Sequence, residues 1–421
     1  MAKLKEERHF TAPFTVFILT LPYGISVGFA SVTLPFLLVQ NGFTVAAVAS
    51  ITALGLSSNL WRFAWAPMTD LTLTLHKWYW IGIIFCAVSL LALCFIPLDV
   101  KLTALLTIVV FISQVANTFV IAPVGGFMAK TVKTGQKGMA SGWFQAGNCG
   151  GIGIGGGAGI WLSTHFSYHL SIIVMSVLMM MCAIGLYFVP QVHPEKAENI
   201  KAKLKSIVVD IKELFRSRLA IYTTILIVTP IGAGAATYVW SSVGADWRVT
   251  PDTVALVTGA LSGVIGVVGC IAGGWVADKV GRWWAYFGSG VFMALVTLVM
   301  CVSAFTPFTY TTGVLFYAFT YGFANAAFTA VVLHAIGKGL ASTKYALLSS
   351  IANLGPVYMT ALDGYLHDKY SIKFMLMGET VLGIVFTLIL LIVLSRLGLH
   401  KTEAQPDDME DMPEVILTNP A

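Results

Sequence analysis

The stretch Gly274-Trp-Val-Ala-Asp278-Lys279-Val-Gly281-Arg282 places one acid, two bases and two glycines between long apolar runs. A second charged loop runs from Trp65 to Trp78 and carries Asp70, which lies 208 positions before Asp278. Each half of the 421-residue chain therefore holds an acidic loop at the corresponding place. This spacing predicts a chain of two equivalent halves.

The composition excludes an ordinary soluble protein. Hydrophobic residues make up 57% and charged residues 11% of the chain, and the mean hydropathy is +0.82, whereas about a quarter of the residues in a typical globular domain are charged. A membrane-spanning helix needs about 20 mostly apolar residues, and the apolar runs here are too long for barrel strands. We therefore expect an all-α integral membrane protein.

Twelve apolar segments are candidate spans, centred roughly on residues 26, 55, 88, 114, 151, 179, 231, 263, 294, 323, 353 and 384. An even number puts both termini on one side. With the termini in the cytoplasm, 20 Lys and Arg residues fall in cytoplasmic segments and four fall on the other side. Because basic residues concentrate in cytoplasmic loops, the sequence predicts a multi-pass protein with both termini cytoplasmic.

The same pattern divides the chain into an N-terminal six-helix half (1–190), a basic cytoplasmic linker (191–218), a C-terminal six-helix half (219–397) and an acidic disordered tail (398–421). The linker has apolar residues at helical spacing between lysines, which fits an amphipathic helix on the membrane surface or a solvated connection. All six cysteines fall within spans, where a free cysteine is an apolar packing residue.

An offset of 208 residues extends the internal repeat beyond the loops. It aligns Pro22 with Pro230, Gly24 with Gly232, Asn117 with Asn325, Gln145 with Asn353, and Lys130 with Lys338. Amide side chains are rare inside apolar spans, so the alignment of amides in one half with amides in the other is the strongest evidence for the repeat. Parallel halves of this kind are a known transporter architecture.

The twelve spans, the basic central loop and the Gly-x-x-x-Asp-Lys-x-Gly-Arg turn resemble the major facilitator superfamily over residues 10–397. The resemblance implies two pseudo-symmetric halves and transport by alternating access. It also implies a central cavity lined by spans one, four, seven and ten, with spans three, six, nine and twelve outside it.

The first-half loop, Trp61-Arg-Phe-Ala-Trp-Ala-Pro-Met-Thr-Asp70, is similar to a narrower signature, Lys-Phe-Leu-Trp-x-Pro-Leu-x-Asp. That signature marks a branch containing AmpG-type muropeptide permeases, acetyl-CoA transporters and some siderophore permeases. Arg62 stands at the signature's lysine and keeps its charge, and Leu21-Pro22-Tyr23-Gly24 is similar to the same branch. This resemblance implies a bacterial cytoplasmic (inner) membrane and a muropeptide-like solute.

By resemblance, the two acidic loops form the cytoplasmic gate. Their carboxylates follow the ends of spans two and eight, where they can approach basic side chains or a helix N-terminus. Glycines there permit close approach and a tight turn. The alternative is a charged turn that only sets topology. The expected gate residues are Asp70, Lys77, Gly274, Asp278, Lys279, Gly281 and Arg282.

Charges within spans are costly, so each is a candidate for function. Arg62 lies near the cytoplasmic end of span two, where it either meets an anionic group of the solute or snorkels to the surface. Glu379 lies about two turns into span twelve. It is either a proton-coupling residue or a carboxyl group packed and hydrogen-bonded between helices. Asp363 is expected near the outer end of span eleven and is a second proton-coupling candidate.

Polar and aromatic residues on the inner spans form the expected solute cavity, which suits a medium-sized, hydrogen-bonding solute. Each of these residues alternatively bonds one helix to another. The candidates are Tyr23, Arg62, Gln114, Asn117, Gln145, Asn148, Tyr238, Trp240, Tyr317, Tyr321, Asn325 and Asn353. Span five adds a ladder of Gly147, Gly151, Gly155 and Gly159, which permits close helix packing.

Other functional classes have weaker support. His165 and His169 lack a nearby acidic ligand, and His334 lacks a nucleophile or acid, so we expect no enzyme, no metal and no cofactor. A transporter-like sensor acting through the acidic tail, and a drug or metabolite exporter, stay open. The sequence favours a monomeric secondary transporter in the lipid bilayer, importing a small polar solute with protons and binding no nucleic acid.

Overall fold

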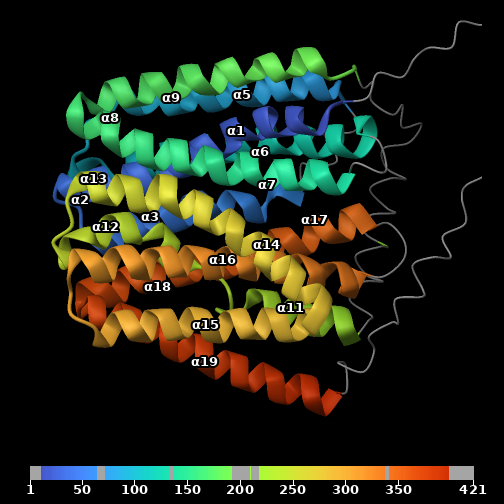
Figure 1. The fold of residues 1–421 in the computed structure, drawn as a ribbon. Coiled ribbons are helices and arrows are strands. Elements are labelled where there is room, and N and C mark those ends of the chain that lie inside the picture. The colour runs from blue at the N-terminus through green and yellow to red at the C-terminus, as the bar shows by residue number, and fades with distance from the viewer. Residues whose placement is uncertain are drawn as a thin grey trace, which may run out of the picture.

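The computed structural model describes residues 11–63, 72–132, 137–191, 209, 218–336 and 341–397. These residues form helices and connecting segments without a strand. Both ends of the described chain lie at one end of the bundle, on the right in Figure 1. We call this end the terminal face and the other end the opposite face.

The N-terminal half makes six passages between the two faces, and several of them consist of more than one helical element. They are α1 (Pro13–Gly28) with η1 (Phe29–Thr33) and α2 (Leu34–Gln40); α3 (Val45–Ser57) with η2 (Ser58–Leu60); α5 (Leu75–Ala92) with η3 (Leu93–Phe95); α6 (Thr103–Thr131), preceded by η4 (Val100–Leu102); α7 (Lys137–Gly153) with η6 (Ile154–Ala158) and α8 (Gly159–His165); and α9 (Tyr168–Cys182) with η7 (Ala183–Phe188).

The C-terminal half makes the other six passages, so the expected all-α class and twelve spans are confirmed. They are α11 (Arg218–Val228) with η8 (Ala235–Tyr238), α12 (Trp240–Val243) and η9 (Gly244–Trp247); α13 (Pro251–Val254) with η10 (Ala255–Leu261) and α14 (Ser262–Val280); α15 (Arg282–Val302); α16 (Pro307–Ile336); α17 (Ala341–Ala352) with α18 (Leu354–Lys369); and α19 (Ile372–Leu397).

Helix starts follow local sequence signals. Thr44 and Thr250 are the N-caps of the second and eighth passages, and each hydroxyl accepts a backbone N–H three residues later, from Ala47 and Thr253. A cap of this kind satisfies one of the free N–H groups of the first turn. The two caps mark equivalent places in the two halves.

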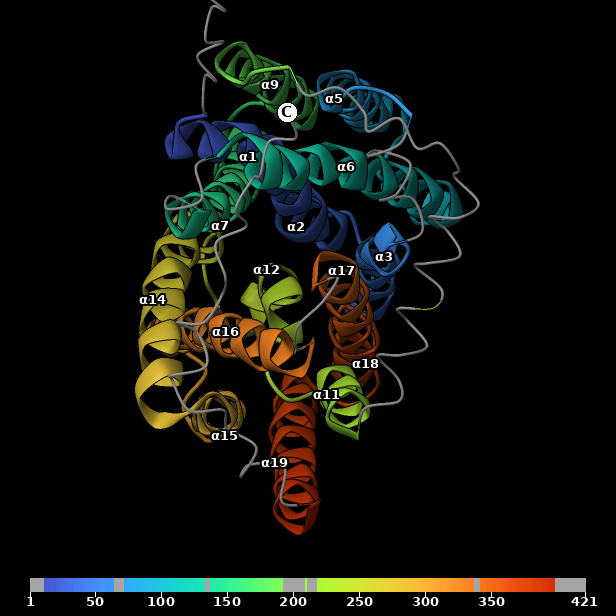
Figure 2. The same ribbon diagram turned by 90° about the vertical axis from the view of Figure 1, so that its right-hand side faces the viewer.

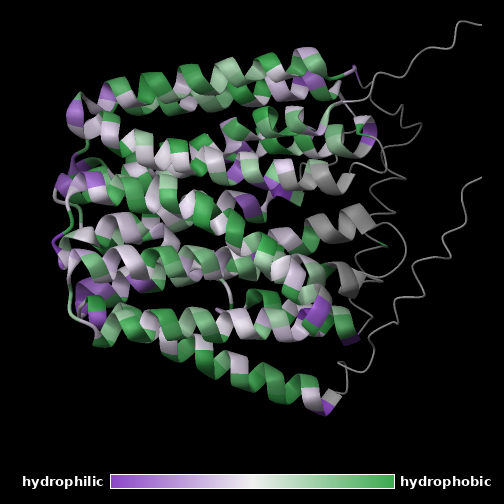
Figure 3. Cartoon of the chain, in the orientation of Figure 1, coloured by the Kyte–Doolittle hydropathy of each residue, from purple (hydrophilic) through white to green (hydrophobic). Residues whose placement is uncertain are grey.

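The exterior of the bundle is apolar enough for lipid. Among the described residues, eight helices are long and apolar enough to cross a membrane, and Val45–Leu60 and Arg218–Val228 are shorter apolar helices. Apolar residues dominate the middle of the bundle, and hydrophilic residues gather toward its two ends (Figure 3). Large apolar side chains such as Val88 on α5 and Ile392 on α19 are exposed.

The seventh passage differs from the continuous span expected around residue 231. Its helix stops at Val228 and resumes as a short 3-10 turn at Ala235. Pro230 has no N–H to continue the helix, and Gly232 and Gly234 adopt φ values of 68° and 64°, a region that favours glycine. The sequence Pro-Ile-Gly-Ala-Gly therefore breaks this span inside the bundle.

The glycine ladder brings two helices of the first half into backbone contact, as expected. A Cβ added at Gly151 would lie 2.5 Å from the carbonyl oxygen of Leu21, and one at Gly155 would lie 2.1 Å from that of Ile25. Thr33 donates to the carbonyls of Gly155 and Gly156 at 2.7 and 2.9 Å. These bonds satisfy carbonyls within the π-helical turn η6.

The two halves meet along two seams, α3 against α18 and α7–η6 against η10–α14 (Figure 2). At the second seam, a Cβ added at Gly259 would lie 2.4 Å from the Cα of Gly157. Helices α5, α9, α15 and α19 lie at the periphery in the same view, as the resemblance implied for spans three, six, nine and twelve.

Shared apolar packing between the halves lies toward the opposite face. Phe36 and Leu37 of α2 belong to one buried cluster with Trp240 and Val243 of α12. The other buried clusters of the described residues each belong to one half. This conformation is therefore closed by a common core on the opposite-face side.

The backbone contact in the first half predicts a sharp difference between neighbouring glycines. Gly151→Ala should lower the thermal unfolding midpoint of the detergent-purified protein, since overpacking costs about 1–3 kcal/mol. Gly150→Ala is the matched control, because its Cβ would lie 3.8 Å from the Phe17 ring, an ordinary contact. Equal midpoints for the two variants would contradict the observed packing.

Candidate functional site

Polar side chains from both halves gather between α1 and α16. In the first half, the Tyr23 hydroxyl donates to Asn59 Oδ1 at 3.4 Å, and Tyr23 interacts electrostatically with Arg62. Both Tyr23 and Arg62 are half-buried. Asn59 lies in η2, which directly follows α3, so this corner joins the first and second passages.

The second half faces this corner with two tyrosines. The hydroxyls of Tyr238 and Tyr321 are 3.3 Å apart, and Tyr321 also interacts with Asn325. Tyr23 interacts electrostatically with both tyrosines. All three keep some solvent-accessible surface although they lie deep between the halves. We call Tyr23, Asn59, Arg62, Tyr238, Tyr321 and Asn325 the central polar cluster.

Three further cavity candidates lie on neighbouring helices and are half-buried. Gln145 and Asn148 are on α7, and Asn148 Oδ1 has no hydrogen-bond partner in the described part of the chain. Asn353 follows α17, and its amide donates to Ser349 O at 2.7 Å. Asn148 thus keeps an unused acceptor, while Asn353 is partly engaged with its own chain.

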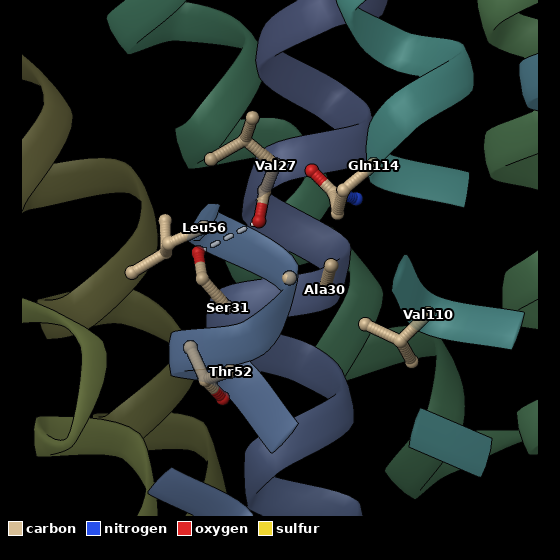
Figure 4. Close-up of a pocket in the computed structure, with 8 residues that line it drawn as sticks. Val27, Ala30, Ser31, Thr52, Leu56, Val110 and Gln114 are labelled. Atoms are coloured by element: carbon tan, nitrogen blue, oxygen red, sulfur yellow. Dashed lines mark hydrogen bonds between the residues drawn. The ribbon is translucent and has the colours of Figure 1, made fainter. Parts of the chain in front are cut away.

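Gln114 and Asn117 are buried between helices of the first half. The Asn117 amide donates to Tyr23 O at 3.0 Å, and the Gln114 amide donates to Ser26 Oγ at 3.2 Å. Both amides therefore bond α6 to α1. Gln114 also lines a small pocket (Figure 4) whose other lining residues are Val27, Ala30, Ser31, Thr52, Gly55, Leu56 and Val110.

Trp240 and Tyr317 are packed in the core of the second half. Their side chains are almost fully buried, and their rings meet edge to face with centroids 5.5 Å apart. The Tyr317 hydroxyl donates to Glu379 Oε2 at 3.3 Å. Tyr317 thus contacts a buried acid and lies one turn before Tyr321 of the central polar cluster on α16.

The two proton-coupling candidates lie side by side. Asp363 and Glu379 are 0% and 7% exposed, and their side chains interact with each other. Asp363 lies in the last two turns of α18, which ends at Lys369, and its side chain is buried rather than exposed to solvent. We call Asp363 and Glu379 the carboxyl pair.

The carboxyl pair contains more acceptors than donors. Both carboxylate oxygens of Asp363 and Oε1 of Glu379 have no donor among the described residues. Two ionised carboxylates in one buried site repel each other strongly, and a shared proton removes that repulsion. The arrangement has the chemistry of a proton-binding site.

The broken passage leads into the central polar cluster. Ala236 in η8 is buried in the same apolar cluster as Tyr317. Tyr238 follows two residues later and meets Tyr321. The break leaves backbone carbonyls without partners in the helix. The Tyr286 hydroxyl donates to Ile231 O and the Tyr358 hydroxyl to Val228 O, each at 2.8 Å.

The expected gate is only partly described. Asp70 lies outside the described residues, and Asp278 is placed only by its backbone in α14. Lys279 Nζ lies 4.4 Å from the Trp275 ring centroid, and Gly281 has a φ of 103° at the turn into α15, where Arg282 begins the helix. Lys77 is exposed on α5, and a Cβ at Gly274 would touch no described atom, so no close approach requires that glycine.

Two parts of the site were missed by the sequence analysis. Asn59 has no partner in the internal repeat, so its place beside Tyr23 had no signal. The break in the seventh passage did have one, since Pro230, Gly232 and Gly234 fall within five residues. Discontinuous helices of this kind mark binding sites in transporters.

An apolar bundle of two six-helix halves, with polar side chains between them and one broken span, is the architecture of a membrane transporter. The chain matches the family described as the Major Facilitator Superfamily over residues 16–360. It belongs to that family.

A solved structure gives the same fold. The chain is similar to the crystal structure of a mutant of the nucleoside transporter NupG, with 13% identity and a TM-score of 0.69. The match covers 90% of this chain and 99% of that chain. A comparison with curated proteins finds no match. The protein is thus a multi-pass membrane transporter of a small molecule and not an enzyme.

Proposed function

We propose that this protein is a proton-coupled secondary transporter that imports a medium-sized polar solute, with muropeptide-like compounds as the first candidate. The observation that carries the proposal is the connection from the carboxyl pair through Tyr317 on α16 to Tyr321, one turn later, and Tyr238. We place the protein as a monomer in the bacterial cytoplasmic membrane, with the terminal face in the cytoplasm.

Alternating access follows from the way the halves pack. Their common apolar core lies toward the opposite face, while the polar cluster lies between α1 and α16 with residual exposure. Rotation of one half against the other along the glycine contact of Gly157 and Gly259 would close the terminal face and open the opposite one. Small residues at this seam permit such sliding.

The solute class is inferred from the chemistry of the cluster and from the branch resemblance. Three tyrosine hydroxyls and two amides offer hydrogen bonds beside aromatic faces, which suit sugar rings and amides. Arg62 adds one positive charge for an anionic group of the solute. Muropeptides combine sugar rings, amides and anionic groups. The alternatives are siderophores, acyl-CoA-like compounds and nucleosides. Nucleosides are included because the structure of similar fold is that of a nucleoside transporter.

Proton coupling is assigned to the carboxyl pair. A proton bound there neutralises the excess of acceptors, and its loss restores the repulsion between two buried carboxylates. Because the Tyr317 hydroxyl donates to Glu379, that change acts on α16. The part of α16 that carries Tyr321 would then shift with the protonation state, which links the proton to solute binding.

Uptake into proteoliposomes tests the solute and its driving force. A labelled muropeptide, a ferric siderophore, acetyl-CoA and a nucleoside are supplied with and without an inward proton gradient, and we expect gradient-driven accumulation of the muropeptide. Tyr238→Phe and Tyr321→Phe should raise KM about 2- to 10-fold, the equivalent of one hydrogen bond. The control is Tyr187→Phe in η7, because the Tyr187 side chain is exposed on the outside of the bundle, away from the cluster.

Gradient-driven accumulation of another solute of the panel would show that the muropeptide assignment is wrong, and it would still support proton symport. If no member of the panel responds to the proton gradient, the proposal of proton symport fails. Gradient-driven loss of a preloaded solute would instead identify an exporter.

Substitutions in the carboxyl pair should separate coupling from binding. We expect Glu379→Gln and Asp363→Asn to reduce gradient-driven accumulation about 5- to 150-fold, the usual range of coupling between linked sites. Solute exchange across the membrane without a gradient should persist, since it needs no net proton movement. The control is Asp99→Asn, whose carboxylate only accepts the Lys101 N–H at 2.9 Å in an exposed loop.

Wild-type accumulation in both acid variants would show that the proton binds elsewhere. Equal loss of exchange and accumulation would assign the pair to folding, which the thermal unfolding midpoints of the same variants would reveal.

The cytoplasmic gate is proposed from sequence, with Asp70, Asp278 and their basic neighbours holding the terminal face closed in the other state. Asp278→Asn should then increase the time spent open at that face. A maleimide added from the terminal face should label the half-buried Cys149 several-fold faster in this variant. Unchanged labelling together with unchanged uptake would refute the gate.

A further inference from the structure

A carboxylate of the second half bonds the first turn of a helix of the first half at the opposite face. Asp368, in the last turn of α18, accepts the backbone N–H of Val45 at 3.1 Å and that of Ala46 at 2.7 Å. These two residues begin α3. A negative charge at a helix N-terminus is stabilising, and bonds to an ionised acceptor are stronger than neutral ones. The contact therefore joins the two halves through charge-assisted hydrogen bonds.

The first turn of α3 takes its hydrogen bonds from both halves. The first N–H groups of a helix have no partner within the helix. Here the Thr44 hydroxyl, in the first half, accepts the N–H of Ala47, and the N–H groups of Val45 and Ala46 bond to Asp368. If the two halves separate at this face, these two N–H groups must exchange a carboxylate for water.

A glycine on the same face of α18 allows the two helices to approach. Gly364 lies four residues before Asp368, so both face α3. A Cβ added at Gly364 would overlap the Cβ of Ala49 and would lie 2.9 Å from the carbonyl oxygen of Val45. Any side chain at this position would push α18 away from α3. The carboxylate reaches the start of α3 because the glycine brings the helices together.

A histidine holds the carboxylate from the side of the second half. His367 Nδ1 is 3.1 Å from Asp368 Oδ1, and His367 Nε2 is 3.0 Å from Asp246 Oδ2 in η9. All three side chains belong to the second half, so these contacts do not depend on the position of α3. The carboxylate is thus held in place in advance, which reduces the conformational entropy lost when it binds the first half.

We propose that Asp368 and Gly364 form a latch that holds the halves together at the opposite face and must open before a solute can pass there. The inference rests on the alternating access proposed above, in which the halves separate at this face in the other state. Separation would break both bonds from Asp368 to α3, and it would leave the contacts of His367 unchanged. The latch therefore stabilises the conformation that is closed at the opposite face.

A second polar contact crosses between the halves at the same face and is weaker. His165, the last residue of α8, has its Nε2 atom 3.8 Å from Oδ1 of Asp252 in the first turn of α13. The two side chains are 44% and 65% exposed, and exposed ion pairs contribute little to stability. Asp368 is 24% exposed and makes two short bonds, so we assign the latch to the seam between α3 and α18.

Chemical labelling of a buried reporter tests the latch in the full-length protein in lipid nanodiscs. The reporter is Val243→Cys in a background without the six native cysteines. Val243 is 1% exposed and lies in the apolar cluster that both halves share, so a maleimide reacts there at a rate that follows the population open at the opposite face. Asp368→Ala should raise this rate about 5- to 30-fold, the effect of losing a charged helix cap.

Gly364→Ala tests the same latch by a different route, because it retains Asp368. The added methyl group meets Ala49 only while α3 and α18 are together, so it disfavours the closed state and should also raise the labelling rate. The matched control is Asp246→Asn, which removes a carboxylate beside His367 that makes no bond to the first half. This variant should label at the rate of the parent protein.

A second reporter separates opening from loss of structure. A background that retains only Cys86, which is fully buried in the core of the first half, should stay equally unreactive with and without Asp368→Ala. Parent labelling rates at position 243 in both latch variants would overturn the proposal, and so would an equal acceleration at Cys86. Because no solute or proton gradient is present, the latch can fail while proton-coupled uptake is found, and the reverse.

Discussion

A bilayer offers no water to the peptide backbone, so every break in a membrane helix must find its hydrogen-bond partners within the protein. The seventh passage breaks at Pro230, and the freed carbonyls of Val228 and Ile231 accept hydroxyls from Tyr358 and Tyr286. These bonds hold an irregular segment at the depth where a solute would bind. The central polar cluster depends on it, since Tyr238 lies a few residues after the break and meets Tyr321.

The contacts between the halves are of two kinds. On the part of the second seam nearer the opposite face, Gly157 meets Gly259 with no side chain between the backbones, a surface on which helices can slide. At the opposite face, Asp368 bonds the first turn of α3 and His367 bonds two carboxylates. Of these polar contacts, only the bonds from Asp368 to α3 cross between the halves, because both carboxylates beside His367 belong to the second half.

Much of the fold follows from the sequence, because the bilayer makes length and hydropathy decisive. The twelve spans, the peripheral places of α5, α9, α15 and α19, and the close packing of Gly151 and Gly155 agree with expectation. The site agrees less well. Among the predicted cavity residues, Tyr238 and Tyr321 meet each other between the halves, whereas the amides of Gln114 and Asn117 bond α1 and α6 together. Helical spacing cannot tell which face of a polar helix meets a partner.

The sequence by itself determined the class, because 57% hydrophobic residues in runs of span length have a stable place only in a membrane, and the family match identifies a transporter. Only the tertiary structure decided which charges act together. Asp363 and Glu379 are 16 residues apart on different helices, and Asp246 and His367 are 121 apart. A carboxyl group's ability to hold a proton depends on neighbours within a few ångströms, and those neighbours come from folding rather than from sequence position.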